Sequence, residues 1–313
     1  MKINIIEPIG VCDGVLHALS EITRIRILKK NKNIYLFGPL IHNENINKYF
    51  RGLKIDIIET KGLNEETKKL LLSSYNNDDV IVFQAHGTKN LYKEILEKNG
   101  VEYFDLTCPI IKATKNLILN SLNNEENEVV FVGKKEHDET ISIMDLSKDS
   151  LFLYDIKNGF INDLEPKGDN IDIYFQSTLS ITDFEYFCNF FKEKYKNIHI
   201  KNDICPKIRI RQEKIIHDFE TNPNLVIVVG SETSSNTNEL FKIASNKYHN
   251  AIVKRINSIE EIEDFDFSNI KEINVISGTS ALNETVNSIV DFLKTKWKFY
   301  LKNIKKCKRF MYF

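Results

Sequence analysis

Three copies of one short pattern decide the fold of this chain: Ile34-Tyr35-Leu36-Phe37-Gly38, Val129-Val130-Phe131-Val132-Gly133 and Val226-Ile227-Val228-Val229-Gly230. The glycines that end these runs are 95 and 97 residues apart. Continuous apolar runs of this length are typical of strands in parallel sheets that are buried on both faces. The pattern therefore predicts three parallel-sheet modules, each with a binding loop at the carboxyl end of such a strand.

Two further markers repeat with almost the same period. A second apolar run recurs before a polar loop, and the three loops are Gln84-Ala85-His86-Gly87-Thr88, Gln176-Ser177-Thr178-Leu179-Ser180 and Ser277-Gly278-Thr279-Ser280-Ala281. Three cysteines, Cys12, Cys108 and Cys205, are 96 and 97 residues apart. Segments between the strands have helical spacing of apolar residues. We therefore expect three similar α/β modules.

The fold class that follows is α/β, with three similar domains whose small parallel sheets are arranged about a pseudo-threefold axis. The expected boundaries are residues 1–105, 106–200 and 201–291, followed by a basic aromatic C-terminal tail over residues 292–313. For the strand within residues 1–13, packing with the third module is an alternative to packing with the first.

Composition excludes several classes of protein. A chain of 313 residues with 42% hydrophobic residues is too long for one ordinary domain and too apolar to be disordered. Its apolar runs are shorter than the roughly 18 to 20 residues of a membrane span. The first residues read as a strand, without a signal-peptide or transit-peptide pattern before them. We therefore expect a soluble, cytoplasmic protein with no membrane span.

The cysteines have a metal-binding interpretation. Five cysteines are an odd number in a large intracellular chain, which argues against a disulfide framework. Modules packed about a threefold axis would bring Cys12, Cys108 and Cys205 together. Three thiolates can hold a four-iron four-sulfur cluster with an open fourth iron, or zinc with one open position, and soft ligands without clustered histidine favour iron and sulfur. The alternative is three separate buried thiols. Cys188 and Cys307 break the period, so we expect them to be structural.

Polar residues follow the recurring glycines. The candidates in the first two modules are His42 after Gly38, His86 directly before Gly87, and His137 with Glu139 after Gly133. The third module has Ser234-Ser235-Asn236-Thr237 after Gly230. A glycine followed by a Ser/Asn-rich helix start can bind a small phosphate through backbone amides and the helix dipole. The alternatives are an ordinary helix cap and histidines that only complete hydrogen bonds.

Nine motifs, in order along the chain, resemble those of one family. They are Gly10-Val11-Cys12-Asp13-Gly14-Val15, Gly38-Pro39-Leu40-Ile41-His42-Asn43, Ala85-His86-Gly87, Thr107-Cys108-Pro109, His137-Asp138-Glu139, Gln176-Ser177-Thr178-Leu179-Ser180, Asp203-Ile204-Cys205 with Arg211-Gln212, Gly230-Ser231 with Ser234-Ser235-Asn236, and Gly278-Thr279-Ser280-Ala281. Over roughly residues 1–290 the chain resembles the 4-hydroxy-3-methylbut-2-enyl diphosphate reductases of the LytB family.

This resemblance implies that the three α/β domains surround a central cavity, and that the protein is an oxidoreductase of the non-mevalonate isoprenoid pathway. One 4Fe-4S cluster would be held by Cys12, Cys108 and Cys205, and its open fourth iron would meet the allylic hydroxyl of the substrate. Two electrons and two protons would remove that oxygen as water, which gives isopentenyl diphosphate and dimethylallyl diphosphate.

The resemblance also implies roles for the loop residues. Glu139 would deliver the proton, His137 would relay or orient it, and Ser177 would hold the hydroxyl or the leaving water where the family usually has Thr. The diphosphate would be bound by His42, His86, Ser234, Ser235, Asn236 and Ser280.

Some positions depart from the family pattern. The run Pro206-Lys207-Ile208-Arg209-Ile210 replaces small polar residues after Cys205, and we expect this altered loop to contribute differently. Asp138 follows His137 where the family has Pro, which adds a carboxyl group beside the proposed proton donor. Leu282 likewise stands where the family has Pro, and this change should matter less.

Two other functions remain open. One is another three-cysteine iron-sulfur enzyme, similar to quinolinate synthase, whose open iron would act as a Lewis acid in a dehydration. The other is a non-enzymatic binding protein for a phosphorylated small molecule. The pair of His137 and Glu139 and the Ser234–Asn236 segment favour the reductase over the first of these, and a visible cluster spectrum would separate it from the second.

The C-terminal tail differs electrostatically from the rest of the chain. Residues 292–313 hold eight Lys or Arg and no acid, so residues 1–291 carry −9 of a net charge of −1. A helix with a solvated basic end is one interpretation. The other is a docking surface for an acidic electron donor such as ferredoxin or flavodoxin, or for anionic lipid. The negative body argues against nucleic acid as a partner.

Overall fold

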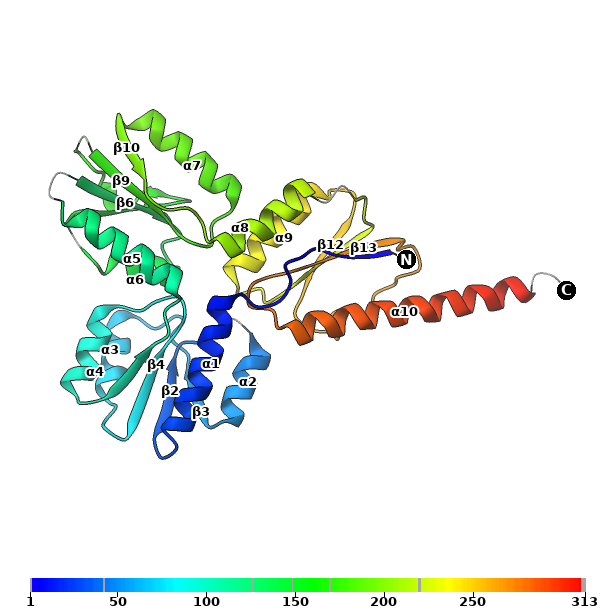
Figure 1. The fold of residues 1–313 in the computed structure, drawn as a ribbon, viewed down its shortest axis with the longest axis horizontal. Helices are drawn as coiled ribbons and strands as arrows, with labels where there is room; N and C mark the ends of the chain where they lie inside the picture. The colour runs from blue at the N-terminus through cyan, green and yellow to red at the C-terminus, as the bar shows by residue number, and fades with distance from the viewer. Residues whose placement is uncertain are drawn as a thin grey trace. The chain divides into compact units, whose positions relative to one another are not determined.

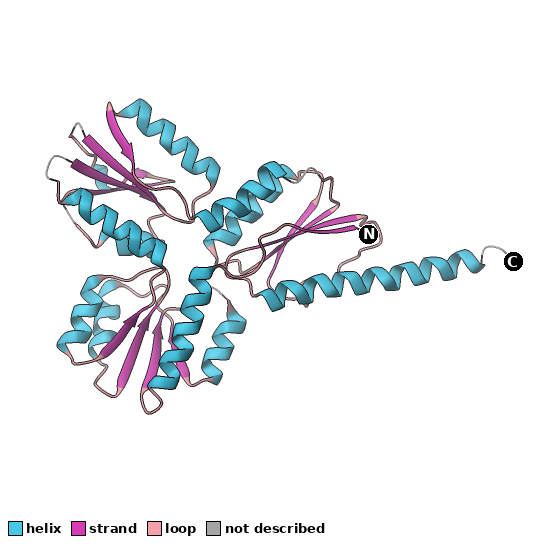
Figure 2. Ribbon diagram, in the orientation of Figure 1, coloured by secondary structure: helices cyan, strands magenta, loops and turns pink. Residues whose placement is uncertain are grey.

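The computed structural model describes residues 2–41, 43–124, 127–147, 149–168, 170–218 and 221–310 (Figures 1 and 2). The chain forms two compact units. One contains residues 1–12 together with 207–313, and the other contains residues 13–206. The strands form three separate sheets, of which two belong to the unit of residues 13–206 and one to the other unit.

The first sheet has the strand order β3-β2-β4-β5, and all its strands are parallel. The elements are α1 (Asp13–Leu28), β2 (Asn33–Phe37), α2 (Glu44–Gly52), β3 (Ile55–Ile58), α3 (Glu65–Ser73), β4 (Asp79–Phe83), α4 (Asn90–Lys98) and β5 (Glu102–Asp105). Every residue of β4 is buried, as expected for a strand whose sheet is covered on both faces.

The second sheet has the order β10-β9-β6-β7-β8 and is parallel except for the short edge strand β8. The elements are α5 (Pro109–Leu122), β6 (Asn127–Gly133), α6 (Asp138–Met144), β7 (Leu151–Asp155), β8 (Gly159–Phe160), the 3₁₀ helix η1 (Ile161–Asp163), β9 (Asn170–Phe175), α7 (Ile181–Lys194) and β10 (Asn197–Ile200).

The third sheet has the order β1-β13-β11-β12 and is parallel. The elements are β1 (Lys2–Ile5), α8 (Pro206–Glu213), the π-helical segment η2 (Lys214–Asp218), β11 (Leu225–Val229), α9 (Ser235–Lys247), β12 (Ile252–Ile256), β13 (Glu272–Ser277) and α10 (Asn283–Phe310). The N-terminal strand β1 therefore pairs with β13 and completes the third sheet.

All three sheets have one topology. The strand that ends at a recurring glycine (β2, β6 or β11) is flanked by the next strand along the chain (β3, β7 or β12) and by the strand before the polar loop (β4, β9 or β13). A fourth strand (β5, β10 or β1) pairs with that last strand. The prediction of three similar α/β modules with small, mostly parallel sheets is confirmed.

Alternate residues of β11 show how such a sheet is stabilised. Leu225, Ile227 and Val229 belong to one apolar cluster, which also contains residues of α10, whereas Val226 and Val228 belong to another with residues of α9. All five side chains are fully buried. Because successive strand residues point to opposite faces, both faces of the sheet are covered.

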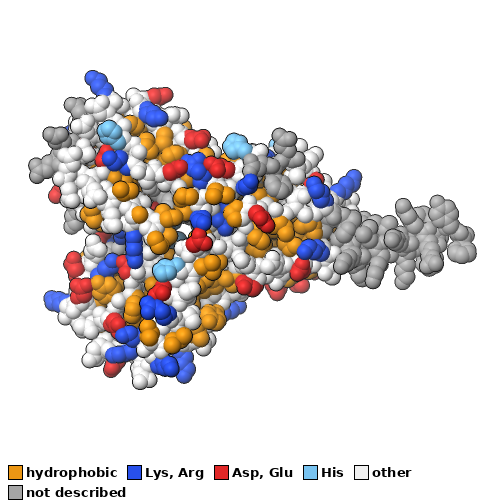
Figure 3. All heavy atoms as spheres, viewed as in Figure 1, with side chains coloured by type: hydrophobic (Ala, Val, Ile, Leu, Met, Phe, Trp, Pro, Cys, Tyr) orange, Lys and Arg blue, Asp and Glu red, His pale blue; other side chains and the backbone are white. Residues whose placement is uncertain are grey.

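Charged side chains of both signs are interspersed on the face drawn in Figure 3. Exposed ion pairs such as Lys69 with Glu66, at 2.9 Å, join neighbours along one helix. Pairs of this kind contribute little to stability in water. The apolar clusters of the sheets therefore dominate the stability of each module.

One detail differs from the sequence-based expectations, and a second shows where the predicted tail begins within the fold. The residues after Cys205 were expected to form a loop, but Pro206 opens helix α8, as Pro109 opens α5 after Cys108. Proline is favoured at the first helical position because that residue needs no backbone N–H there. The predicted boundary at residue 292 falls inside α10, where Leu293 is fully buried.

Among the helices of the described residues, none combines the length and the apolar character that crossing a membrane requires.

Candidate active site

The three periodic cysteines occupy equivalent backbone positions in their modules. Each stands directly before a helix, which is α1, α5 or α8. Each also donates its backbone N–H to a carbonyl in the polar loop at the carboxyl end of its sheet. The three bonds are Cys12 to Thr279 at 3.3 Å, Cys108 to Ala85 at 2.9 Å and Cys205 to Ser177 at 2.9 Å. The shared period of the sequence therefore reflects a shared local structure.

None of these thiols is in a disulfide, and all three are partly exposed, whereas Cys188 on α7 is buried. Cys108 and Cys205 belong to the unit of residues 13–206, and Cys12 belongs to the other unit. Within the part of the chain that the structure describes, no three His, Cys, Asp or Glu side chains form a group that could hold a metal ion. The ligand set of Cys12, Cys108 and Cys205, which draws on both units, stays a prediction.

Glu139 is a buried carboxyl group in the first turn of α6, and its side chain is only 1% exposed. The Ser177 hydroxyl donates to Glu139 Oε2 at 2.7 Å, and the Ser177 backbone N–H donates to Oε1 at 2.9 Å. Burial raises the pKa of Glu139 to about 7, although the Ser177 bonds and the charge of Lys115 act in the opposite direction. The structure therefore places the predicted Glu139 and Ser177 in direct contact.

His137 and His86 come from different sheets of the same unit and lie side by side. His137 caps α6, and its Nδ1 accepts the Glu139 backbone N–H at 3.2 Å, so the neutral ring carries its proton on Nε2. The ring centroids of His86 and His137 are 5.6 Å apart, with the rings edge to face. Burial holds the pKa of His86 below its ordinary value, while the charge of Asp138 acts in the opposite direction.

The third sheet has a separate cluster of polar groups at the carboxyl ends of β11 and β13. Ser234 is buried and caps α9, where its Oγ accepts the Thr237 N–H at 3.4 Å. Asn236 is also buried and donates from Nδ2 to Thr279 Oγ1 at 3.2 Å. The candidates Ser235 and Ser280 are partly exposed at the same strand ends. His42, the remaining candidate, lies outside the described residues.

Steric crowding explains why glycine occupies two positions in this cluster. A Cβ atom at either Gly230 or Gly278 would collide with the Thr237 side chain. Gly230 also has a φ of 147°, in the region that favours glycine. Backbone therefore lies directly against α9 at this edge of the sheet.

Two residues that hold the Cys12 loop and the histidine loop had no predicted role, although Arg211 belongs to one of the family motifs. Arg211 is buried and donates to the Gly10 carbonyl at 2.7 Å, two residues before Cys12. Lys115 donates from Nζ to the Thr88 carbonyl at 3.2 Å. Lys115 is seven residues after Cys108, which puts both residues on one face of the helix, and this spacing is a signal that could have found it.

Comparison with known proteins assigns the family. The profile of the LytB protein family matches residues 3–294. The chain belongs to the LytB protein family. A relative in Malacoplasma penetrans named 4-hydroxy-3-methylbut-2-enyl diphosphate reductase is 32% identical over 298 residues, which is 95% of this chain and 98% of the relative. A relative of the same name in Dictyoglomus thermophilum is 30% identical over 300 residues, 94% of this chain and 97% of the relative.

Solved structures agree with the fold of this LytB family member. The E-1-hydroxy-2-methyl-but-2-enyl-4-diphosphate reductase from Plasmodium falciparum is similar with a TM-score of 0.79 and 21% identity, over 93% of this chain and 87% of that protein. A structure described as (E)-4-hydroxy-3-methyl-but-2-enyl diphosphate reductase, the terminal enzyme of the non-mevalonate pathway, has a TM-score of 0.65 and 22% identity, over 94% of this chain and all of that protein.

Proposed function

We propose that this chain is a 4-hydroxy-3-methylbut-2-enyl diphosphate reductase. It converts its substrate to isopentenyl diphosphate and dimethylallyl diphosphate by two-electron reductive dehydroxylation. Membership of the LytB family and the names of the two bacterial relatives support this activity. The observation that carries the chemistry is the buried carboxyl group of Glu139, which two bonds from Ser177 fix in place.

The cysteines fit a 4Fe-4S cluster by the chemistry of the donor set. Thiolates are the ligands that iron-sulfur clusters use. Each of the three cysteines stands at a helix N-terminus, where the helix dipole favours a negative charge, and Cys108 makes no side-chain capping bond to its helix. We propose Cys12, Cys108 and Cys205 as ligands. When bound, the cluster would pass on two electrons, one at a time, from an external donor and would offer an open iron for the hydroxyl oxygen of the substrate.

Glu139 supplies the proton, and the side chains around it assist. Hydroxide is a poor leaving group, so a carboxylic acid beside the departing oxygen lowers the barrier by letting it leave as water. A pKa of about 7 keeps a large fraction of Glu139 protonated near neutral pH. Ser177, which bonds to both carboxyl oxygens, would hold the substrate hydroxyl beside this proton. His137 would orient Glu139 or return a proton to it.

The diphosphate requires several donors because it leaves water on binding. We propose His42, His86, Ser234, Ser235, Asn236 and Ser280 for this role. The N-terminus of α9 adds backbone N–H groups, and its 13 residues give it a substantial dipole. Imidazole, hydroxyl and amide groups together can match the oxygens of a diphosphate.

The deciding experiment is anaerobic oxidation of a reduced viologen dye by purified protein, with and without the hydroxylated allylic diphosphate. We expect dye oxidation that depends on this compound, with both isoprenoid diphosphates as products. Dye oxidation that does not depend on the compound, or binding of the compound without turnover, would contradict the reductase function. The chain would then be another iron-sulfur enzyme or a non-enzymatic binding protein. A Cys188→Ser variant is the control for the cluster and should keep its iron.

A further inference from the structure

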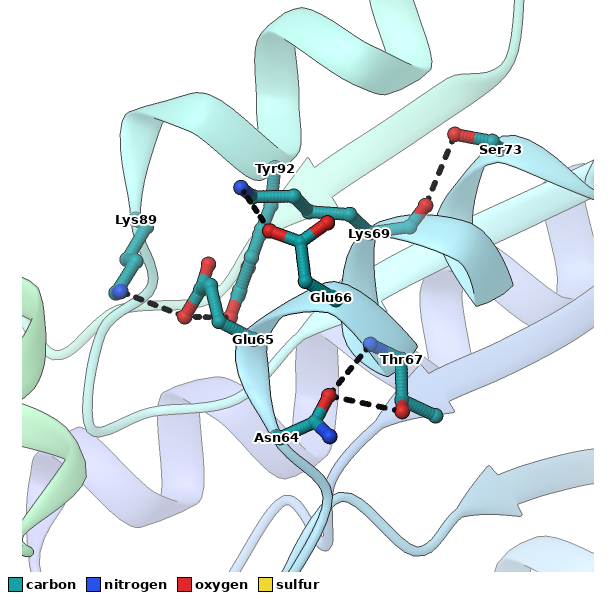
Figure 4. A network of polar contacts seen from close by, with 8 residues as sticks. All are labelled: Asn64, Glu65, Glu66, Thr67, Lys69, Ser73, Lys89 and Tyr92. Atoms are coloured by element: carbon teal, nitrogen blue, oxygen red, sulfur yellow. Dashed lines mark hydrogen bonds and ion pairs between the residues drawn. The ribbon is translucent and has the colours of Figure 1, made fainter.

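The loop of residues 85–90, here called the His86 loop, carries the proposed diphosphate ligand His86 and is anchored to its own module at one end. Glu65 of α3 accepts two hydrogen bonds at Oε2, from Lys89 Nζ at 2.7 Å and from Tyr92 Oη at 3.2 Å (Figure 4). The loop therefore enters α4 from a fixed position.

The same loop is held by the second module of the unit. The Asn90 backbone N–H donates to Asp145 Oδ2 at 2.7 Å. Lys89, the capping residue of α4, makes no side-chain capping bond, so Asp145 supplies the cap from another module. Asp145 stands at the C-terminal end of α6, where the helix dipole disfavours an acid. Its position is explained by the N-terminus of α4, where the dipole favours one.

Lys115 of α5 holds the middle of the loop. Its ammonium donates to the Thr88 carbonyl at 3.2 Å and lies 3.7 Å from the place where a Cβ atom of Gly87 would stand. Such a Cβ would also collide with Ser142 of α6, and Gly87 has a φ of 98°. Glycine is therefore required for this close approach between the two modules.

The charge of Lys115 is balanced by its surroundings. Burial lowers the pKa of Lys115 to about 8, and Lys93 acts in the same direction, while three acids act against it: Asp105, Asp145 and Glu139. Lys93 is itself paired with Asp105 at 2.6 Å. With a pKa near 8 the side chain stays mostly protonated at neutral pH and keeps all its donors.

We propose that Lys115 and Asp145 are positioning residues of the reductase. Together they hold the His86 loop of the first module against α5 and α6 of the second, and so keep His86 beside His137 and the bound diphosphate. The inference rests on the proposed function, in which His86 binds the substrate, and it adds two residues that never touch the substrate themselves.

Steady-state kinetics of the cluster-loaded enzyme test the role. Lys115→Met and Asp145→Ala should each raise the KM for the allylic diphosphate about tenfold, the equivalent of one hydrogen bond to a charged group, while kcat changes less than about twofold. Lys115→Arg and Asp145→Asn should restore most of the KM because they keep a donor and an acceptor. The fold-increase in KM of the double variant should be smaller than the product of the two single fold-increases, since both residues hold one loop.

Matched controls come from α5 and from the segment between α6 and β7. Lys112 is an exposed lysine about one turn earlier on α5, and Asp149 is an exposed acid four residues after Asp145. Lys112→Met and Asp149→Ala should leave KM unchanged. Thermal unfolding of every variant shows whether the chain still folds, and Asp145→Ala carries the test alone if Lys115→Met does not fold.

Hydrogen exchange of the full chain gives a second measurement that does not depend on activity. The Asn90 amide should exchange about tenfold faster in Asp145→Ala, because it loses its acceptor. Unchanged exchange and unchanged KM would overturn the proposal, and so would faster exchange with an unchanged KM, because the loop would then be held without positioning His86. An inactive wild-type protein would instead contradict the proposed function, and faster exchange would still establish the anchoring.

Discussion

At the scale of single residues, a competition between burial and hydrogen bonding sets the pKa of Glu139. Two bonds from Ser177 and the charge of Lys115 stabilise the carboxylate, yet burial outweighs them and the pKa rises to about 7. A carboxyl group that is exposed on a surface would have released its proton more than two pH units earlier. Position within the fold, more than residue type, therefore makes this side chain a candidate acid.

Glu139→Gln should keep the iron content of the protein and lose most turnover. General acid catalysis contributes roughly a hundredfold or more, and an amide cannot deliver the proton. In the wild type, kcat/KM should fall as the pH rises through about 7, because the protonated form is the active one. Dye-coupled turnover over a pH series checks both points, and near-normal activity of the variant would remove Glu139 from the mechanism.

The same carboxyl group should make stability depend on pH. Its pKa in the folded chain is about 7, above the ordinary value of 4.5, so the folded state binds this proton more tightly than the unfolded state. This contribution favours folding below about pH 4.5 and is lost as the pH rises through 7. The free energy of unfolding of Glu139→Gln, relative to wild type, should therefore increase over that window in urea titrations of the cluster-free protein. Parallel curves for the two proteins would contradict the elevated pKa.

Arg211→Met should loosen the loop that carries Cys12. It leaves the buried Gly10 carbonyl without its donor, which should lower the free energy of unfolding by about 1 to 3 kcal/mol and reduce the iron that survives gel filtration. Arg209 on the same helix pairs with Glu213 at a partly exposed site, so Arg209→Met should cost no more than about 0.5 kcal/mol. Equal losses in the two variants would refute a specific role for Arg211.

At the scale of elements, strands were predicted more completely than side-chain contacts. The recurring apolar runs predicted the central strands, since continuous burial leaves a signature in the sequence of the strand itself. The contacts of Lys115 and Arg211 were not predicted, because each donates to a backbone carbonyl, and every residue has one, so the acceptor leaves no signature in the sequence. The family motifs implied a role for Glu139 and a role for Ser177, but not the contact between them, because 38 residues separate the two along the chain.

The predicted boundary between the third module and the basic tail, at residue 292, lies within helix α10. Leu293 continues the buried stripe of Val286, Ile289 and Val290, so the core face of α10 passes the predicted boundary. Lys296 also donates to the Glu263 carbonyl at 3.0 Å. Residues up to 296 therefore include side chains that belong to the third module.

Truncation after Lys296 tests the tail as a docking element. It removes six Lys or Arg residues and keeps Leu293, so the melting temperature and the dye-driven turnover should not change. Turnover driven by ferredoxin or flavodoxin should fall, and the difference should shrink as salt is added. Equal effects with dye and with protein donor would discard the docking role. Truncation after Asp291 is the contrasting variant and should destabilise the chain by about 2 to 5 kcal/mol through loss of buried Leu293.

At the scale of the whole molecule, the chain is three copies of one topology with its ends in the third copy. In the first two modules a helix joins the polar-loop strand to the fourth strand: α4 leads to β5 after three residues, and α7 leads to β10 after two. In the third module α10 follows β13, but the fourth strand is β1, at the opposite end of the sequence. The first 14 residues of α10, residues 283–296, match the 14 residues of α7. The helix-to-strand connection that the third module lacks would therefore run from residue 296 to residue 2.

A circular permutant tests this equivalence. Residue 296 is joined to residue 2 through two or three residues such as Asn-Gly, and the chain is opened between the exposed Lys30 and Asn31 after α1. We expect cooperative unfolding within about 5 °C of the linear chain 1–296, because the new link closes a short loop between ends that the topology already brings together. The permutant should also retain iron, since β1 still leads directly to Cys12. If the linear control unfolds cooperatively and the permutant does not, α10 does not return to β1, and the third module is not equivalent to the first two.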